Sequence, residues 1–112
     1  MFINRLKLML SYLRKRPKVN GLPVEIGIEI TTACNMDCSM CPRQDAIESG
    51  KRTLGFMNRN LFKKIINEIK DFAEIIYLHG LGEPILHPEF FDFLRLAKKA
   101  KLHVGISTNG MA

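Results

Sequence analysis

The sequence predicts an α/β fold in which strands and helices alternate in the order βαβαβ. An alternating apolar and polar stretch at residues 24–31 indicates one strand, and a short apolar run at 75–78 and the segment at 103–107 indicate two more. Two stretches with helical spacing separate these three strands. Strands joined by single helices form a parallel sheet with right-handed crossovers, so the loops that follow them meet at one edge.

An amphipathic segment precedes the first strand. Residues 2–16 place five apolar side chains at helical spacing: Phe2, Leu6, Met9, Leu10 and Leu13. Pro17 and residues 21–23 end this helix, so we expect residues 1–22 to be a basic leader helix with its linker and residues 23–112 to be the domain. The favoured interpretation is a helix that packs on the domain behind it. The less favoured one is contact of residues 2–16 with an anionic membrane surface.

The first strand and the first helix of the domain each have two faces. In residues 24–31 the isoleucines would pack under outer helices of a barrel, while Gly27 and Glu29 would face inward. Residues 44–56 show little periodicity and are predicted to be loop. Asn58 is a suitable N-cap for a helix with a buried apolar stripe made of Leu61, Phe62, Ile65, Ile66, Ile69 and Phe72.

The second half of the chain repeats this order. Residues 75–78 are predicted to be a strand buried on both sides, followed by a glycine-rich turn at residues 80–84. A helix is expected from about Pro88 to Lys101, with Phe91, Leu94 and Ala97 at its apolar spacing. A third strand at 103–107 closes in Thr108-Asn109-Gly110.

Charge and composition exclude several classes of function. The net charge is +6 over 112 residues, and residues 1–18 hold six bases and no acid. The remaining 11 bases are balanced by 11 acids, so the domain has no basic face for nucleic acid. No stretch reaches the about 20 apolar residues of a membrane span. We therefore predict a cytoplasmic protein in a reducing compartment.

Three cysteines within eight residues, Cys34, Cys38 and Cys41, indicate a metal site after the first strand. Clustered thiolates suit an iron–sulfur cluster or zinc better than a disulfide framework, which needs pairs. Three cysteines can hold three irons of a cubane cluster and leave the fourth open. Zinc held by three cysteines and a water is chemically reasonable, but structural zinc usually has a fourth protein ligand, which His79 or His87 could supply only from another loop. The spacing of the three histidines itself does not require a metal.

The cysteine spacing resembles the Cys-x₃-Cys-x₂-Cys signature of the radical S-adenosylmethionine (SAM) superfamily. The flanking residues 29–35 and 41–43 are similar to its branch with C-terminal SPASM or twitch domains. Met40, before the last cysteine, stands where many members have an aromatic residue near the adenine. The resemblance implies a partial (β/α) barrel, the N-terminal half of a (β/α)₆ core.

The other two strand ends add to this resemblance. Gly82, Glu83 and Pro84 match the last three residues of a Gly-Gly-Glu-Pro motif that binds the amino group of SAM in the family, although alone they could form an ordinary turn. Ser107 and Asn109 lie where related enzymes place side chains near the SAM ribose or carboxylate, and alone they too could form a plain turn. All three loops occupy the carboxyl ends of strands, where parallel α/β folds bind ligands.

The resemblance implies a [4Fe–4S] cluster and SAM as cofactors and a ferredoxin or flavodoxin as electron donor. In the family, one electron from the cluster cleaves SAM to a 5′-deoxyadenosyl radical, which abstracts hydrogen from a substrate, here unidentified. Because only three of the six strands are visible, we expect a fragment, or half of a split enzyme completed by a second chain. The alternative from another class is a non-catalytic iron–sulfur or zinc module, or an inactive truncated fragment.

Overall fold

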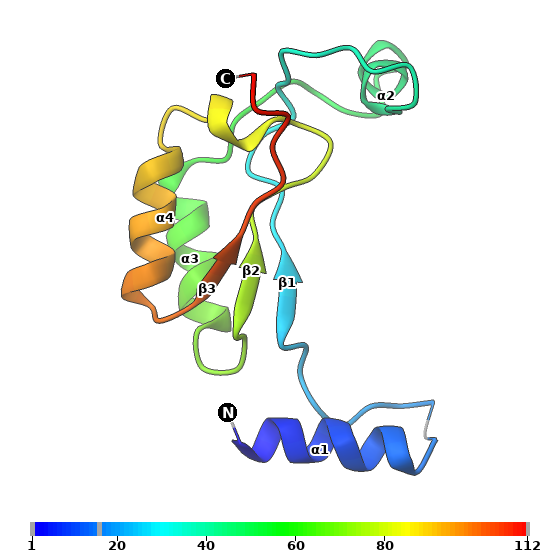
Figure 1. The fold of residues 1–112 in the computed structure, drawn as a ribbon, viewed down its shortest axis with the longest axis vertical. Helices are drawn as coiled ribbons and strands as arrows, with labels where there is room; N and C mark the ends of the chain where they lie inside the picture. Colours follow the sequence, from blue (N-terminus) through cyan, green and yellow to red (C-terminus); the bar gives the residue numbers. More distant parts are fainter. Residues whose placement is uncertain (1, 16, 112) are drawn as a thin grey trace.

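The computed structural model describes residues 2–15 and 17–111. Positions 1, 16 and 112, which the predicted ranges include, lie outside the described residues. Figure 1 shows the order of the elements: α1 (Phe2–Leu13), β1 (Glu25–Gly27), α2 (Arg43–Glu48), α3 (Arg59–Ile69), β2 (Ile75–Tyr77), the short 3₁₀ helix η1 (Pro84–Leu86), α4 (Phe90–Lys99) and β3 (His103–Gly105).

The three strands form a parallel sheet in the order β1-β2-β3, as predicted. Glu25, Ile75 and His103 lie level with one another across the sheet. Pairing continues beyond the strands, because Ile28 N donates to Tyr77 O (2.8 Å). The three chain segments therefore emerge side by side at their carboxyl ends.

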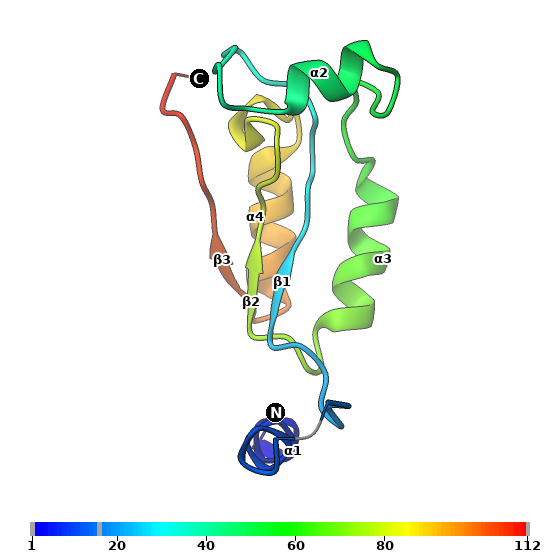
Figure 2. The same ribbon diagram turned by 90° about the vertical axis from the view of Figure 1, so that its right-hand side faces the viewer.

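Helices α3 and α4 both cover one face of the sheet, as Figures 1 and 2 show. The rings of Phe62 and Phe93 stack between them, with centroids 4.1 Å apart and planes 6° from parallel. Ile28, Ile30 and Ile76 are buried in the same core. Helices on one face only are expected of a barrel wall, whereas a doubly wound sheet carries helices on both faces.

The opposite face of the sheet is left open by the described residues. Side chains alternate along parallel strands, so Gly27, Tyr77 and Gly105, which are level in register, belong to this face. The expected burial of residues 75–78 on both sides is wrong, because Ile75 and Tyr77 are only half-buried. Ile28 and Ile30, which alternate with Gly27 and Glu29, are buried under the helices. This confirms the prediction that Gly27 and Glu29 face inward, away from the helices.

Local details differ from the sequence predictions where short helices form. Residues 44–56 are not all loop, because Pro42 starts the six-residue helix α2. The second long helix begins at Phe90, after η1, which Glu83 caps through its side chain.

Leu61 and Phe91 are exposed, so these members of the predicted apolar stripes lie outside the core.

Helix α1 forms as predicted, but the expectation that its apolar stripe packs on the domain is wrong. The helix lies below the amino-terminal edge of the sheet in Figure 1, apart from α3 and α4. It contacts the domain through an ion pair between Arg5 and Glu74. Its five predicted stripe residues are all exposed. Among the described residues, no helix has both the length and the apolar character to span a bilayer.

Candidate cofactor-binding site

The loops after the three strands line one cavity of about 430 Å³. This volume falls in the range of small-molecule sites. Each strand contributes a separate part of its wall: Cys34, Met36, Cys38 and Cys41 after β1, His79 through Glu83 after β2, and Ser107, Thr108 and Asn109 after β3. The prediction that the three loops form a single site agrees with this arrangement.

The three cysteines lie on the loop after β1 as free thiols. Cys34 and Cys41 are partly buried, and Cys38 is exposed. Residues 38–41 of this loop form a turn, in which Cys41 N donates to Cys38 O (2.9 Å). The buried Arg43 donates from Nη2 to Met36 O (3.3 Å), so α2 anchors the middle of the loop.

Hydrogen bonds between the loops fix their relative positions. Asn109 Nδ2 donates to Asn35 Oδ1 (2.9 Å), and Asn35 Nδ2 donates to Met111 O (2.9 Å). The backbone of the second loop lies against the first, because Glu83 N donates to Ala33 O (2.8 Å). The cavity is therefore bounded by three segments that are bonded to one another.

Glu83 links the second loop to the third with a buried carboxylate. Its Oε2 accepts from Asn109 N (2.7 Å), and its Oε1 accepts from Ile85 N (3.2 Å). Burial by itself would raise the pKa of Glu83, but hydrogen bonds from Asn109, the Thr108 hydroxyl and Ile85 outweigh it, so the pKa lies below the ordinary value. The group is a stable anion that holds its neighbours in place.

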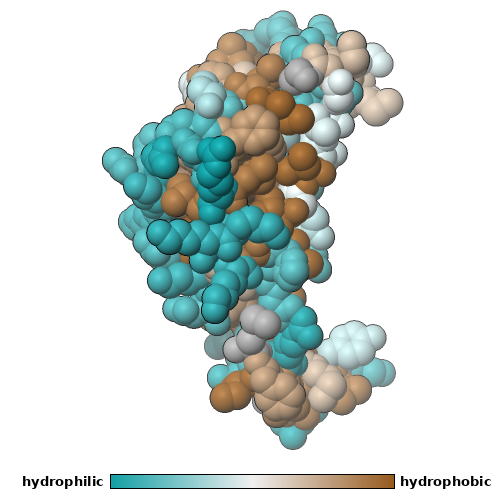
Figure 3. Space-filling view, turned by 60° about the vertical axis from the view of Figure 1, so that its left-hand side comes forward, coloured by the Kyte–Doolittle hydropathy of each residue, from teal (hydrophilic) through white to brown (hydrophobic). Residues whose placement is uncertain are grey.

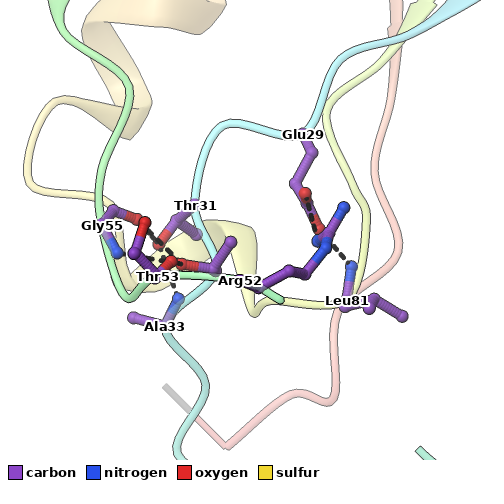
Figure 4. A network of polar contacts seen from close by, with 8 residues as sticks. Glu29, Thr31, Ala33, Arg52, Thr53, Gly55 and Leu81 are labelled. Atoms are coloured by element: carbon purple, nitrogen blue, oxygen red, sulfur yellow. Dashed lines mark hydrogen bonds and ion pairs between the residues drawn. The ribbon is translucent and has the colours of Figure 1, made fainter. Parts of the chain in front are cut away.

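Glu29, two residues beyond β1, supports the second loop, as Figure 4 shows. Its Oε1 accepts from Leu81 N (2.7 Å), and its Oε2 pairs with Arg52 Nη1 (2.6 Å). A Cβ at Gly80 would collide with the Glu29 side chain. This close contact explains the glycine, and the two polar contacts give Glu29 a structural role beneath the second loop.

Two threonines in the segment that follows β1 form hydrogen bonds with the segment that returns from α2. Thr31 Oγ1 donates to Gly55 O (3.1 Å) and accepts from Ala33 N (3.0 Å), as Figure 4 shows. Thr32 Oγ1 donates to Thr53 O (2.8 Å). The backbone that leads into the cysteine loop is thus held in place by hydrogen bonds to residues 53–55.

The predicted site residues divide into two groups. Gly82, Glu83, Ser107 and Asn109 line the cavity together with the three cysteines. Met40 is 89% exposed and lies outside the lining, and Pro84 is buried as the first residue of η1. Gly82 is required sterically, because a Cβ there would lie 2.8 Å from Ala33 O.

Sequence reasoning missed His79 as a site residue. Its Nδ1 is buried without a hydrogen-bond partner among the described residues, although the ring lines the cavity. Strand alternation could have found it, because His79 is two residues beyond Tyr77 on the open face. Thr108 and Met36 were missed as lining residues too, and only their position in the loops could have indicated them.

His87, which the zinc alternative considered as a ligand, has a structural role. It is buried, its Nε2 lies 2.9 Å from Met57 O, and its Nδ1 accepts from Glu89 N (3.0 Å). Both ring nitrogens are therefore engaged, and His87 is not free to bind a metal.

The donor set fits the iron–sulfur cluster that the cysteine spacing implies. Three soft thiol ligands share one loop and one cavity, and none is used in a disulfide. Within residues 2–15 and 17–111, no three potential metal ligands converge closely enough to hold a single ion as they stand. His79, whose Nδ1 is buried without a hydrogen-bond partner among the described residues, lines the same cavity.

A half-barrel wall with three thiols and a glycine-rich turn at its carboxyl edge defines an α/β protein with a candidate cofactor site. The model of the radical SAM superfamily matches residues 28–112, which is more than half of the chain. The chain therefore belongs to the radical SAM superfamily, a superfamily of enzymes.

Two curated relatives illustrate this membership. The tungsten-containing aldehyde ferredoxin oxidoreductase cofactor-modifying protein of Pyrococcus furiosus is 42% identical over 85 residues, which are 74% of this chain and 23% of the relative. Mycofactocin maturase MftC of Mycobacterium tuberculosis is 33% identical over 90 residues, which are 80% of this chain and 22% of the relative. The chain thus spans less than a quarter of the length of either relative.

A solved structure confirms the fold. The structure of BtrN in complex with AdoMet and 2-DOIA is similar to this chain, with a TM-score of 0.70 and 28% identity. The similarity covers 82% of this chain and 38% of BtrN. The sheet described here is accordingly a part of the radical SAM fold, as predicted.

Proposed function

We propose that this chain carries the cluster- and SAM-binding part of a radical SAM enzyme. Cys34, Cys38 and Cys41 would hold three irons of a [4Fe–4S] cluster and leave the fourth open. The observation that carries the proposal is that these thiols share one cavity of about 430 Å³ with the ends of β2 and β3. When bound, the cluster and SAM would supply a 5′-deoxyadenosyl radical that abstracts hydrogen from an unidentified substrate.

The residues of the chain would bind and orient SAM beside the cluster. The glycine-rich turn brings backbone groups to the cavity wall at Gly80 and Gly82, where a side chain would not fit. Ser107 and Asn109 add polar groups from the third loop. The Glu83 carboxylate already accepts two backbone hydrogen bonds, so we assign it to positioning these loops.

We propose further that a ferredoxin or flavodoxin supplies the electron and that the protein works in the cytoplasm, where free thiols persist. The open face of the sheet, which includes Tyr77 and His79, would be the inner wall of a barrel. Further βα units, from this protein or from a second chain, would complete that barrel. The assignment to the branch with SPASM or twitch domains stays a prediction.

Anaerobic reconstitution with iron and sulfide, followed by electron paramagnetic resonance, tests the proposal. The reduced chain should show a [4Fe–4S] signal that changes on addition of SAM. Cys38→Ala should abolish the signal, because Cys38 would hold one iron. Ser39→Ala is the matched control, since Ser39 lies in the same loop but outside the cavity lining. A Cys38→Ala variant that retains a SAM-responsive cluster would refute the proposal.

His79 favours a second candidate function, a non-catalytic zinc module. Its unpartnered Nδ1 could add a fourth ligand to the three thiolates, which would give the Cys₃His set of structural zinc sites. Metal analysis of the protein as purified distinguishes the two candidates. Zinc at one equivalent that falls after His79→Ala would support the module, whereas iron content and a SAM response that survive His79→Ala support the radical SAM site.

A further inference from the structure

Helix α1 presents an unbroken apolar stripe to the outside of the molecule. Six side chains of the stripe are between 37% and 79% exposed: Phe2, Ile3, Leu6, Met9, Leu10 and Leu13. On a helix of 3.6 residues per turn they occupy one face about 120° wide. An apolar face of this width is typical of a helix whose apolar side chains are buried against another surface.

The polar side of α1 faces its own chain. Asn4 forms two hydrogen bonds with the backbone of Leu22 in the linker. Its Nδ2 donates to Leu22 O (2.9 Å), and its Oδ1 accepts from Leu22 N (2.8 Å). Ser11 is buried and lies within 3.4 Å of Asn20 N. The helix is therefore attached by polar groups and turns its apolar face away, the reverse of a helix that covers a core.

Basic side chains border the exposed stripe. Lys7 and Arg14 lie along one border of the stripe, and Lys15 and Lys18 follow at the end of the helix, all exposed. Residues 1–18 contain no acid. An apolar stripe bordered by bases fits an anionic surface that also offers an apolar layer.

We propose that α1 binds in the plane of an anionic lipid surface and attaches the protein to it. The stripe enters the boundary between headgroups and acyl chains, and the bases contact lipid phosphates. A second copy of the chain fits less well, because pairing two such helices would bring together two sets of bases with no acid to offset them.

The position of α1 suits this role. Figure 1 shows the helix beyond the amino-terminal ends of the strands, whereas the cysteine loop and the C-terminus lie at the opposite end. Figure 3 shows α1 as a separate lower lobe with brown and tan side chains over much of its visible surface. A protein bound through α1 would keep the cavity pointed away from the lipid and open to solvent.

Vesicle sedimentation tests the proposal with the full chain. Vesicles of phosphatidylcholine with phosphatidylglycerol are compared with vesicles of phosphatidylcholine alone, at low and at high salt. We expect the partition coefficient to be at least about tenfold higher on the anionic vesicles. High salt should reduce this preference, because it screens exposed charges.

Two pairs of substitutions separate the stripe from other exposed apolar residues. Leu6→Glu with Leu10→Glu should lower the partition coefficient about a hundredfold, since two leucines that would enter the lipid are lost. Leu61→Glu with Phe91→Glu is the matched control, because these residues are exposed apolar positions on α3 and α4. Circular dichroism of both double variants establishes that the domain is folded.

A fluorescence measurement tests insertion of the stripe without introducing glutamates. The chain has no tryptophan, so Met9→Trp introduces a single reporter in the stripe and Phe91→Trp one outside it. On anionic vesicles, emission from the Met9→Trp variant should shift to the blue while that from Phe91→Trp stays unchanged. Equal binding to neutral vesicles, equal loss in both double variants, or a lipid-free dimer that Leu6→Glu with Leu10→Glu abolishes would each overturn the proposal.

Discussion

Replacing Glu83 by glutamine removes one acceptor from the junction of the second and third loops. The carboxylate is 3% exposed and accepts from Asn109 N and Ile85 N. Glutamine keeps the shape of the side chain but turns one oxygen into an NH₂ donor. That donor would face a backbone N–H, so one of the two backbone hydrogen bonds is lost.

The cost follows from the charge of the acceptor. Hydrogen bonds to charged groups contribute about 1.5–3 kcal/mol each, and a buried N–H left without a partner adds to the loss. We therefore expect Glu83→Gln to lower the free energy of unfolding by about 2–3 kcal/mol at neutral pH. Glu68→Gln, on the exposed side of α3, should stay within about 0.5 kcal/mol of the wild type.

The pH dependence gives this prediction its specific sign. The pKa of Glu83 is lower in the folded protein than the ordinary value of 4.5, because the hydrogen bonds to its carboxylate outweigh its burial. Its stabilisation is therefore fully present above pH 4.5 and is lost as the pH falls through the lower folded-state pKa. The difference between wild type and Glu83→Gln should be constant from neutral pH to about pH 5 and shrink below it.

Urea unfolding followed by circular dichroism at a series of pH values measures this difference. Hydrogen exchange of the Asn109 amide supplies a local readout, which should accelerate in Glu83→Gln and not in Glu68→Gln. A variant as stable as the wild type at pH 7, or a stability difference that does not change down to pH 3, would show that Glu83 does not hold the loops as an anion.

Three further substitutions test the fold and the cavity. Asn58→Ala removes the side-chain cap of α3 at Leu61 N (2.8 Å) and should cost about 1 kcal/mol in urea unfolding. Phe93→Ala removes a fully buried ring stacked on Phe62 and should cost about 3–5 kcal/mol in the same assay. Gly82→Ala should lower the iron bound on reconstitution, because its Cβ would meet Ala33 O, whereas Gly27→Ala has free space and should bind iron normally.

The strands and long helices were predictable because their patterns reflect a single buried face. The isoleucines of residues 24–31 alternate as the sheet requires, and Asn58 caps the helix that follows. The cysteine loop and the two other strand ends could be assigned to one site since parallel strands end at a common edge. These features are local in sequence or follow from strand direction.

Features set by long-range contacts could not be predicted. Glu83 resembled a ligand-binding acid in the sequence, and only the structure shows its bonds to the backbone of Asn109 and Ile85. The stripe of α1 has the spacing of a core-facing helix, and spacing does not tell whether a core is within reach. The sequence does not single out His79, because the lack of a hydrogen-bond partner at its Nδ1 depends on every other segment around the cavity.

The hydrogen bonds between the loops also determine when the cysteine loop can become ordered during protein synthesis. Asn35 bonds to Asn109 and to Met111, which are 74 and 76 residues further along the chain. A nascent chain on the ribosome that ends before β3 therefore lacks the partners that fix the cysteine loop. Closing so long a loop is entropically costly until the intervening strands and helices have packed. The arrangement of the cysteine loop that the proposed cluster would need is consequently complete only after β3 has emerged.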